Sequence, residues 1–343
     1  MKTAAQQGTT GTDNAAAKVT MQAVVQDAYG TPDVLRVAEI DRPEIADDEV
    51  LIRVRAAGVH IGDWHVMTGQ PYLMRVMGFG LRAPKARVRG MDVAGTVEAV
   101  GKNVTRFQIG DEVFGTGDGS FAEYATCRED KLARKPANLT FEQAAAVPTS
   151  ACTALQALTA GQIGSGQQVL IIGASGGVGI FAAQIAKSFG ADVTGVSSPA
   201  KMDLVRSLGA DAVLDYTKDE LTADGRRYDL ILDMGGNRSL AELRRALTPK
   251  GTLVLVGGEG GGRLVGGAMG RSLRALALSP FVGHNLRMVV AATKAADLQI
   301  LTELIEAGKV TPVIDRTYPL SKVPDAIEYL SSGQARGKIV ITV

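Results

Sequence analysis

The chain is poor in cysteine, in net charge and in long apolar runs, and each shortage excludes a class of protein. Cysteine occurs only at Cys127 and Cys152 among 343 residues, too few for a disulfide scaffold or a cysteine-built zinc site. The formal net charge is +1, from 37 basic and 36 acidic residues, so the whole chain favours neither nucleic acid nor an anionic membrane. No apolar run reaches the roughly 18 residues of a transmembrane helix. We therefore expect a cytoplasmic protein, in a reducing compartment, whose partners are small molecules.

What is present indicates a globular chain with an ample core. Hydrophobic residues make up 45% and charged residues 21% of the sequence, and this length favours about two domains. Residues 1–19 consist mainly of Ala, Gln, Gly and Thr and lack an apolar signal core. We interpret them as a disordered leader.

The chain then changes pattern twice. Residues 20–148 carry short alternating runs between Gly, Pro and Asp turns, which predicts a β-rich domain. In 149–293, wholly apolar runs alternate with helical stretches, which is typical of a doubly wound α/β domain with a parallel sheet. Six strands are expected there, at 169–172, 192–196, 212–214, 230–232, 253–256 and 288–290. Residues 294–343 hold one expected helix and two expected strands, and we expect them to return to the first domain.

The motif with the most chemical content follows the first of those six strands. It reads Gly173-Ala174-Ser175-Gly176-Gly177-Val178-Gly179 and leads into an amphipathic helix. A glycine turn between an apolar strand and a helix presents free backbone N–H groups to a dinucleotide pyrophosphate. The spacing G-x-x-G-x-x-G departs from the G-x-G-x-x-G fingerprint. The assignment as a dinucleotide-binding turn therefore depends on the strand before it and the helix after it. The alternative is an ordinary glycine-rich turn.

The choice of dinucleotide depends on the end of the next strand. NAD enzymes usually carry an acid there to bind the ribose 2′-hydroxyl, whereas this strand ends in Ser197, Ser198 and Lys201. Two hydroxyls and an ammonium suit a 2′-phosphate, so we predict NADPH, with Tyr216 as an adenosine-side contact. Lys201 as a solvated helix lysine is the alternative. Gly257 and Gly258, after the strand at 253–256, are also predicted to contact the cofactor.

Five ordered segments resemble the medium-chain dehydrogenase/reductase superfamily, in its zinc-free quinone oxidoreductase and enone reductase branch. They are residues 57–59, 92–101, 107–113, 145–148 and 173–179. The resemblance implies a GroES-like catalytic domain from 20–148 and 294–343, a Rossmann domain from 149–293, and an active site between them. It also implies a homodimer joined through the edge strands of the Rossmann sheets, here residues 287–291.

The same resemblance implies the absence of zinc. Where zinc-dependent relatives carry their catalytic ligands, this chain has His60, the segment Gly90-Met91-Asp92, and Pro148. A catalytic zinc needs three protein ligands, so we predict none. Without a Lewis acid, oxidation of a simple alcohol is difficult, whereas hydride transfer from NADPH to a quinone or an activated C=C bond needs no metal. We predict this reductase activity on a largely apolar, electrophilic substrate.

Several alternatives remain open. An alcohol or aldehyde dehydrogenase, an enoyl-thioester reductase and a non-catalytic NADPH-binding protein all fit parts of the pattern, and a local RNA-binding patch is a minor one. Cations at Arg75, Arg82, Lys85, Arg87 and Arg89, with no acid until Asp92, either face solvent or bind an anionic substrate tail. The glycine-rich stretch from 257 to 270 suggests a flap near the cofactor.

The catalytic candidates are His60, Asp63 and Tyr72. The segment 58–65 matches a family stretch that usually carries Asn at the position of His60, which in relatives faces the nicotinamide. A histidine there either donates a hydrogen bond as Asn does or supplies a proton. A purely structural hydrogen bond by His60 is the alternative.

Overall fold

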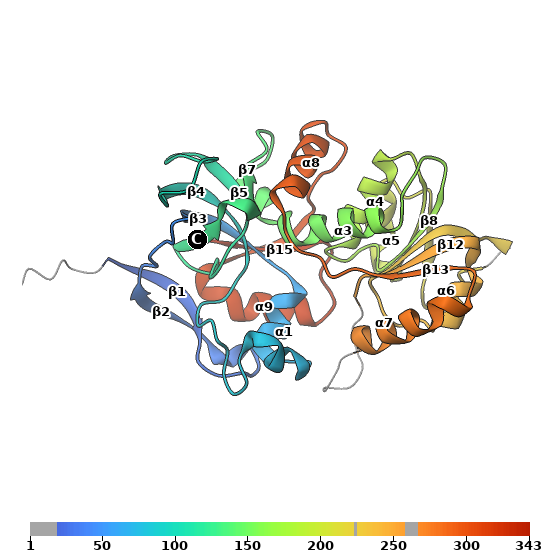
Figure 1. Cartoon of the computed structure of the whole chain (residues 1–343), viewed down its shortest axis with the longest axis horizontal. Coiled ribbons are helices and arrows are strands. Elements are labelled where there is room, and N and C mark those ends of the chain that lie inside the picture. Colours follow the sequence, from blue (N-terminus) through green and yellow to red (C-terminus); the bar gives the residue numbers. More distant parts are fainter. Residues whose placement is uncertain (1–18, 223–224, 258–266) are drawn as a thin grey trace, which may run out of the picture.

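The computed structural model describes residues 19–222, 225–257 and 267–343, which form two lobes side by side (Figure 1). Of the predicted leader, only Val19 lies within the described residues. The lobe with the N-terminal strands is β-rich, and the other alternates strands with helices (Figure 1). The predicted fold class, α/β with a β-rich domain beside a doubly wound one, is confirmed.

The β-rich lobe contains a seven-stranded sheet and a two-stranded one. The larger sheet has the order β14-β15-β3-β4-β5-β7, with β6 also pairing with β3, and β1 pairs with β2. Its strands are β1 (Thr20–Gln26), β2 (Leu35–Asp41), β3 (Glu49–Val59), β4 (Asp92–Val100), β5 (Glu112–Thr116), β6 (Tyr124–Arg128), β7 (Leu132–Arg134), β14 (Ile314–Pro319) and β15 (Lys338–Thr342). Three helices accompany them: α1 (Ile61–Thr68), α2 (Phe141–Ala145) and α9 (Val323–Ser331).

The doubly wound lobe contains a six-stranded sheet in which every neighbouring pair is parallel. Its order is β10-β9-β8-β11-β12-β13, the arrangement of two mononucleotide-binding halves that meet at β8 and β11. The strands are β8 (Gln168–Ile172), β9 (Asp192–Ser197), β10 (Ala212–Asp215), β11 (Tyr228–Asp233), β12 (Leu247–Leu255) and β13 (Asn285–Met288). Five of the six predicted strands are present at the expected places, whereas the sixth, β13, ends at Met288 and so shares only its last residue with the predicted 288–290.

Helices bury both faces of this sheet. Along β8, Val169 and Ile171 belong to one apolar cluster, and Leu170 and Ile172 belong to another. The first cluster includes residues of α3 (Pro148–Ala160) and α4 (Gly179–Ser188), whereas the second includes Leu243 of α6 (Leu240–Arg245) and Ala275 of α7 (Gly267–Leu278). The two helix layers are visible above and below the sheet in Figure 1. Burial on both faces explains why these strands read as continuous apolar runs.

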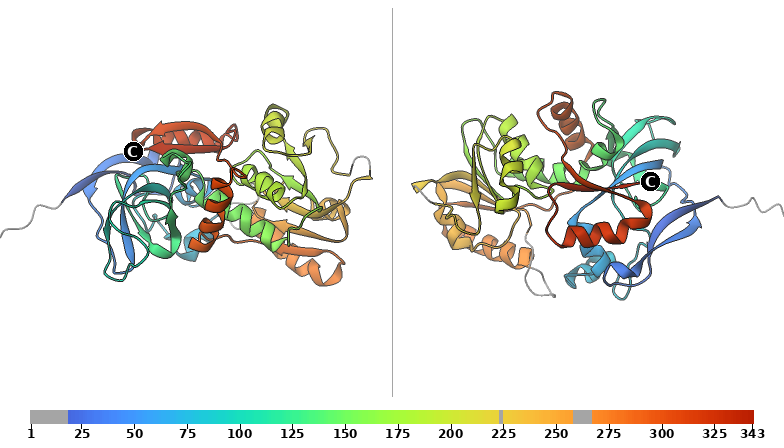
Figure 2. Two further views of the ribbon diagram at one scale, coloured as in Figure 1. Left: turned by 90° about the horizontal axis from the view of Figure 1, so that it is seen from above. Right: turned by 180° about the vertical axis from the view of Figure 1, so that it is seen from behind.

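The chain returns to the β-rich lobe at its end, as expected. After α8 (Ala295–Glu306), β14 pairs in parallel with β15, and β15 pairs antiparallel with β3, where Ile339 faces Val59. Figure 2 shows the last strands and α9 beside the first strands in both views. The helix α9 was not predicted, because it is only nine residues long and a proline lies in its first turn.

Two further observations bear on cellular context. None of the helices in the described residues is long and apolar enough to cross a membrane. Both cysteines are free and buried, and burial raises the pKa of the Cys152 thiol to about 12. The pKa of the Cys127 thiol is also raised by burial, so neither thiol is an activated nucleophile.

Candidate active site

The glycine turn lies between β8 and α4, where the sheet order reverses. Gly173 has φ +88° and Gly179 leaves no room for a side chain, since a Cβ there would lie 2.1 Å from the Gly173 carbonyl oxygen. The N–H groups of Gly173 and Ala174 donate to the Val196 carbonyl, which ties the turn to β9. The N–H groups of Gly177 and Val178 have no acceptor among the described residues. Free N–H groups at a helix N-terminus fit a pyrophosphate.

The end of β9 carries the residues predicted to select the 2′-phosphate. Ser197 is buried and Ser198 half-buried, and the Tyr216 N–H donates to the Ser197 carbonyl at 3.2 Å. Parallel pairing of β9 with β10 therefore brings Tyr216 beside the serines, with its side chain exposed. The ammonium of Lys201 donates to the carbonyl oxygens of Gly333 and Ala335, at 2.7 Å each.

Lys201 thus bridges the two lobes in this structure. Its pKa is lowered, mainly by burial, and Asp315 opposes that shift. Neither alternative for Lys201 describes this bridge, since its ammonium is bonded to two carbonyl oxygens and would have to leave them to meet a phosphate. The bridge could not be read from sequence, because Gly333 lies more than a hundred residues away. The role of Lys201 toward the cofactor stays a prediction.

Gly257 follows β12, at the same sheet edge as the glycine turn, and its nearest neighbour is the Met234 carbonyl of the β11 end. Gly258 lies outside the described residues, as does most of the predicted flap. The helix α7, which follows it, is tied to β11 because Arg271 donates to Asp233 at 2.5 Å. Both Gly257 and Gly258 stay predictions as cofactor contacts.

His60 is the N-cap residue of α1. Its Nδ1 accepts a hydrogen bond from the Gly62 N–H at 3.1 Å, and the Asp63 carboxylate accepts from the His60 N–H at 2.9 Å. In a neutral ring with Nδ1 as acceptor, the proton is on Nε2. That atom is buried without a hydrogen-bond partner among the described residues, 3.7 Å from Asp63 Oδ2. His60 therefore makes the structural hydrogen bonds of a helix cap, and its buried Nε2 has no partner in the described part of the chain.

The other two catalytic candidates have different surroundings. Asp63 is 4% exposed, and the pKa of its carboxyl is raised by burial, with His60 opposing the shift. Its contacts orient His60. Tyr72 is partly exposed, and the Arg75 guanidinium lies 4.7 Å from its ring centre. No contact joins Tyr72 to His60 in the described part of the chain. All three roles stay predictions.

A buried polar group that sequence reasoning missed lies behind His60. The Lys338 ammonium donates to the Val59 carbonyl at 3.1 Å and to Ser150 Oγ at 2.9 Å, and lies 3.9 Å from Asp92 Oδ2. Asp92 Oδ1 accepts from the N–H of Thr149 at 3.1 Å and from its hydroxyl at 2.5 Å. The available signal was a lysine opening an otherwise apolar strand, Lys338–Thr342.

The described residues offer no group of three or more His, Cys, Asp and Glu side chains arranged to hold a metal ion. At the positions compared with zinc ligands, His60 caps a helix, Met91 is 42% exposed and Pro148 begins α3. Neither a methionine nor a proline is a ligand of the kind that zinc prefers.

Three cations of the run are already engaged within the protein. Arg75 donates to the carbonyls of Gly69 and Thr68, Arg87 pairs with Asp27 at 2.6 Å, and Arg89 is buried and donates to the Ala86 carbonyl. Arg82 and Lys85 are exposed and have no partner within the described ranges. At most these two remain for an anionic substrate tail.

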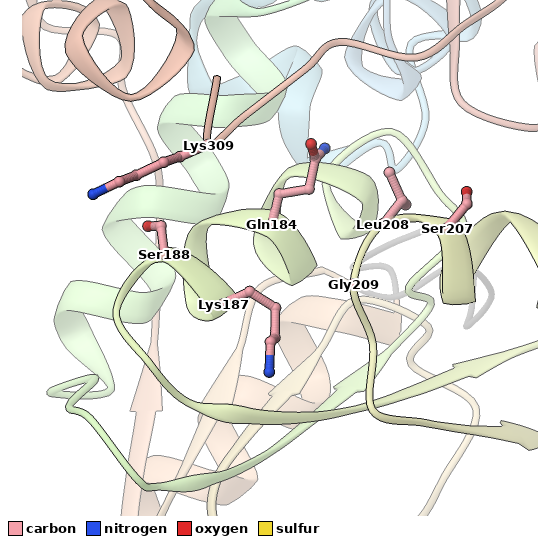
Figure 3. A pocket seen from close by; sticks show the side chains of 7 residues that line it. All are labelled: Gln184, Lys187, Ser188, Ser207, Leu208, Gly209 and Lys309. Atoms are coloured by element: carbon pink, nitrogen blue, oxygen red, sulfur yellow. The ribbon is translucent and has the colours of Figure 1, made fainter. Parts of the chain in front are cut away.

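A surface hollow beside α4 lies apart from these residues (Figure 3). It is lined by Gln184, Lys187, Ser188, Ser207, Leu208, Gly209 and Lys309. Lys187 pairs with Asp211 at 2.8 Å, and Gln184 exchanges hydrogen bonds with the backbone of Thr311. The hollow flanks the C-terminal half of α4, whereas the glycine turn precedes its first residue, so the hollow is not part of the candidate site.

Comparisons with known proteins agree with this geometry. Residues 46–137 match the alcohol dehydrogenase GroES-like domain, and residues 208–341 match the zinc-binding dehydrogenase family. The chain is 35% identical over 328 residues to a 2-methylene-furan-3-one reductase of Solanum lycopersicum, covering 91% of this chain and 76% of the relative. It is 34% identical to the chloroplastic NADPH-dependent alkenal/one oxidoreductase of Arabidopsis thaliana, covering 94% and 79% respectively.

A solved structure extends the likeness to three dimensions. The quinone oxidoreductase of Coxiella burnetii superposes with a TM-score of 0.83 at 28% identity, and the match covers 95% of this chain and all of that one. The two-lobed fold and the dinucleotide turn between β8 and α4 are those of enzymes that use a nicotinamide cofactor. The chain therefore belongs to the medium-chain dehydrogenase/reductase superfamily, in its quinone oxidoreductase-like branch.

Proposed function

We propose that this protein is a zinc-independent reductase that uses NADPH to transfer hydride to a quinone or to the activated C=C bond of an α,β-unsaturated carbonyl compound. Two features together carry the proposal. The glycine turn has backbone N–H groups without an acceptor among the described residues, and the neighbouring strand β9 leads into Ser197, Ser198 and Lys201, with no acid. An acid at this point would repel a 2′-phosphate. Relatives named for alkenal and enone reduction support the substrate class.

The residues divide into those that hold the cofactor and those that face the substrate. Gly177 and Val178 would donate backbone N–H groups to the pyrophosphate, and Lys201 would leave the Gly333 and Ala335 carbonyls for the 2′-phosphate. Bound NADPH supplies the hydride. The reaction needs no metal, because the developing negative charge is on an oxygen that a hydrogen-bond donor can stabilise.

His60 is the proposed donor. When hydride adds to the β-carbon, the C=C electron pair moves toward the carbonyl and leaves an enolate oxygen. The free Nε2–H of His60 would donate to that oxygen, while Gly62 and Asp63 hold the ring. Water then supplies the proton to the α-carbon. In this assignment Asp63 is a positioning residue, and Tyr72 lines the approach to the site.

The domain division, location and assembly complete the proposal. We assign 20–148 and 294–343 to the catalytic domain and 149–293 to the cofactor domain, after a leader at 1–19. The two buried thiols suit a reducing cytoplasm, and recovery of the protein in an organelle on cell fractionation would contradict that location. Among the described residues the edge strand β13 pairs with β12 alone, and its outer side would join a second copy.

The function is tested by NADPH absorbance with metal-stripped protein, offered a quinone, an enone and an enoyl thioester, with a simple alcohol and NADP⁺ in parallel. We expect turnover of the quinone or the enone, faster with NADPH than with NADH and unchanged by chelator. Activity confined to the alcohol after zinc is restored would refute the proposal. Tight NADPH binding without any turnover would support the non-catalytic alternative instead.

Replacement of Lys201 by Ala tests the choice of cofactor. We expect the NADPH dissociation constant to rise about 10- to 100-fold, the cost of a lost charge-assisted hydrogen bond. Affinity for NADH, which lacks the 2′-phosphate, should change by less than about threefold and serves as the internal control. Equal losses for both cofactors would mean that Lys201 acts only through its bridge to Gly333 and Ala335.

His60 is tested by a matched pair, His60→Asn and His60→Ala. Asn keeps both the cap and a donor, so we expect kcat within about tenfold of the natural protein. Ala removes both, and we expect a loss of about 1 kcal/mol in unfolding free energy and of about 10²-fold in kcat. If the two variants lose unfolding free energy to different extents but have equal kcat, the role of His60 is structural only.

Size-exclusion chromatography with light scattering tests the assembly. We expect a species of twice the 35.8 kDa chain mass. Val290, 81% exposed and just beyond β13, would approach its own copy across a two-fold edge pairing, so Val290→Glu should favour the monomer by placing like charges together. A natural protein that elutes only as a monomer excludes the dimer.

A further inference from the structure

We propose that Lys338 is a positioning residue for hydride transfer, which holds the substrate loop around His60 and the glycine turn in a fixed relation. The inference rests on the proposed function, since it assigns a role within that site. It concerns Lys338 together with Asp92 and Ser150, which are called here the junction cluster. They come from β15, β4 and α3, three elements far apart in the chain.

The ammonium of Lys338 connects both sides of the site. Its bond to the Val59 carbonyl fixes the backbone immediately before His60, and its bond to Ser150 Oγ fixes the first turn of α3. An ammonium has three donors. The remaining one faces Asp92 Oδ2, which is buried and has no hydrogen-bond partner in the described part of the chain.

The glycine turn also lies close to the Lys338 side chain. A Cβ placed on Gly177 would lie 3.3 Å from Cδ of Lys338 and 3.4 Å from Ser150 Oγ. Gly177 is among the residues of the turn whose N–H groups have no acceptor in the described part of the chain and could bind the pyrophosphate. The aliphatic part of the Lys338 side chain therefore lies against the turn, while its amine holds the loop that carries His60.

Packing alone does not account for a charge at this position. Lys338 is 2% exposed and Asp92 is fully buried, and burial of two ions usually costs more than an apolar pair of the same volume. Burial lowers the pKa of Lys338, and the carboxylates of Asp92 and Asp63 oppose that shift. A methionine would fill the volume of the aliphatic part of the lysine side chain but would donate no hydrogen bond to Val59 or Ser150.

Loss of the ammonium should therefore affect the rate more than the binding. Without it, the Val59 carbonyl and Ser150 lose their common donor, and the His60 loop is no longer held against the glycine turn. A misplacement of the reacting groups by about 1 Å can cost about 100-fold in rate. The N–H groups that bind the pyrophosphate belong to the backbone and remain.

The central experiment compares Lys338→Met and Lys338→Arg with the matched control Lys309→Met, an exposed lysine beside the hollow in Figure 3. Binding of NADPH is followed by fluorescence, and kcat by NADPH oxidation with an enone. We expect Lys338→Met to lower kcat about 100-fold with the dissociation constant within about threefold, Lys338→Arg to restore part of the loss, and Lys309→Met to change neither. Equal kcat in Lys338→Met and the control overturns the proposal.

The pH profile separates positioning from packing. Deprotonation leaves the Lys338 amine only two N–H donors and removes its charge beside Asp92, so kcat should fall at high pH. Asp92→Asn removes a charge that raises the pKa of Lys338, so this alkaline limb should move to lower pH. The other groups that face the ammonium, Asp63 and His60 of the α1 loop, are unchanged, as is Arg89 beside Asp63. In Lys338→Arg the fall of kcat at high pH should move beyond the measurable range. A fall at the same pH in the natural protein, in Asp92→Asn and in Lys338→Arg would contradict the proposal.

A measurement without turnover separates this proposal from the proposed function. Hydrogen exchange of the NADPH-bound protein should quicken in residues 57–66 of Lys338→Met but not of Lys309→Met. This result would support the role of Lys338 even if the natural protein reduced none of the acceptors, in which case only the proposed function fails. Unchanged exchange overturns the proposal. If Lys338→Met does not fold, Ser150→Ala removes one of the two bonds and is judged by the same two readouts.

Discussion

The antiparallel pairing of β15 with β3 is the constraint on which the arrangement of the two lobes depends. It requires the last strand to return to the sheet that began with β3, so the six-stranded sheet forms an insertion within the β-rich lobe. The pairing ends where Ile339 meets Val59, one residue before the candidate site begins at His60. The last strand is therefore held next to His60, the residue proposed to face the substrate.

Polar groups buried at this junction follow from that pairing. Once β15 lies against β3, Lys338 has no route to solvent and must find acceptors inside, which it does at Val59 and Ser150. The Asp92 carboxylate lies near the Lys338 ammonium and also accepts a hydrogen bond from the N–H of Thr149 at the start of α3. The seam between the lobes is thus polar and specific in geometry, which suits a site where cofactor and substrate are bound by different lobes.

The candidate site divides in the same way. The proposed cofactor side consists mostly of backbone: a turn whose path depends on its glycines and in which the N–H groups of Gly177 and Val178 have no acceptor among the described residues. The substrate side consists of side chains, with His60 held by its cap and by Asp63. A backbone cradle tolerates changes in the substrate side, which is consistent with one fold serving relatives named for quinones, alkenals and a furanone.

The sequence by itself determined the parts that depend on local pattern. Apolar runs of strand length predicted five of the six parallel strands and only the last residue of β13, and the glycine turn was identified because its strand, turn and helix are contiguous. Short or mixed strands such as β2, β6 and β7 carry no such pattern, since each includes exposed residues among its buried ones. They were missed, as was α9.

Only the tertiary structure decided which distant residues meet. The bridge from Lys201 to Gly333, the engagement of Arg75, Arg87 and Arg89, and the junction cluster all join segments separated by loops or by a whole lobe. Sequence shows that Lys338 opens an apolar strand, but its charge acquires partners only when β15 pairs with β3. The physical reason is that hydrogen bonds act over about 3 Å, a distance that the order of residues along the chain does not specify.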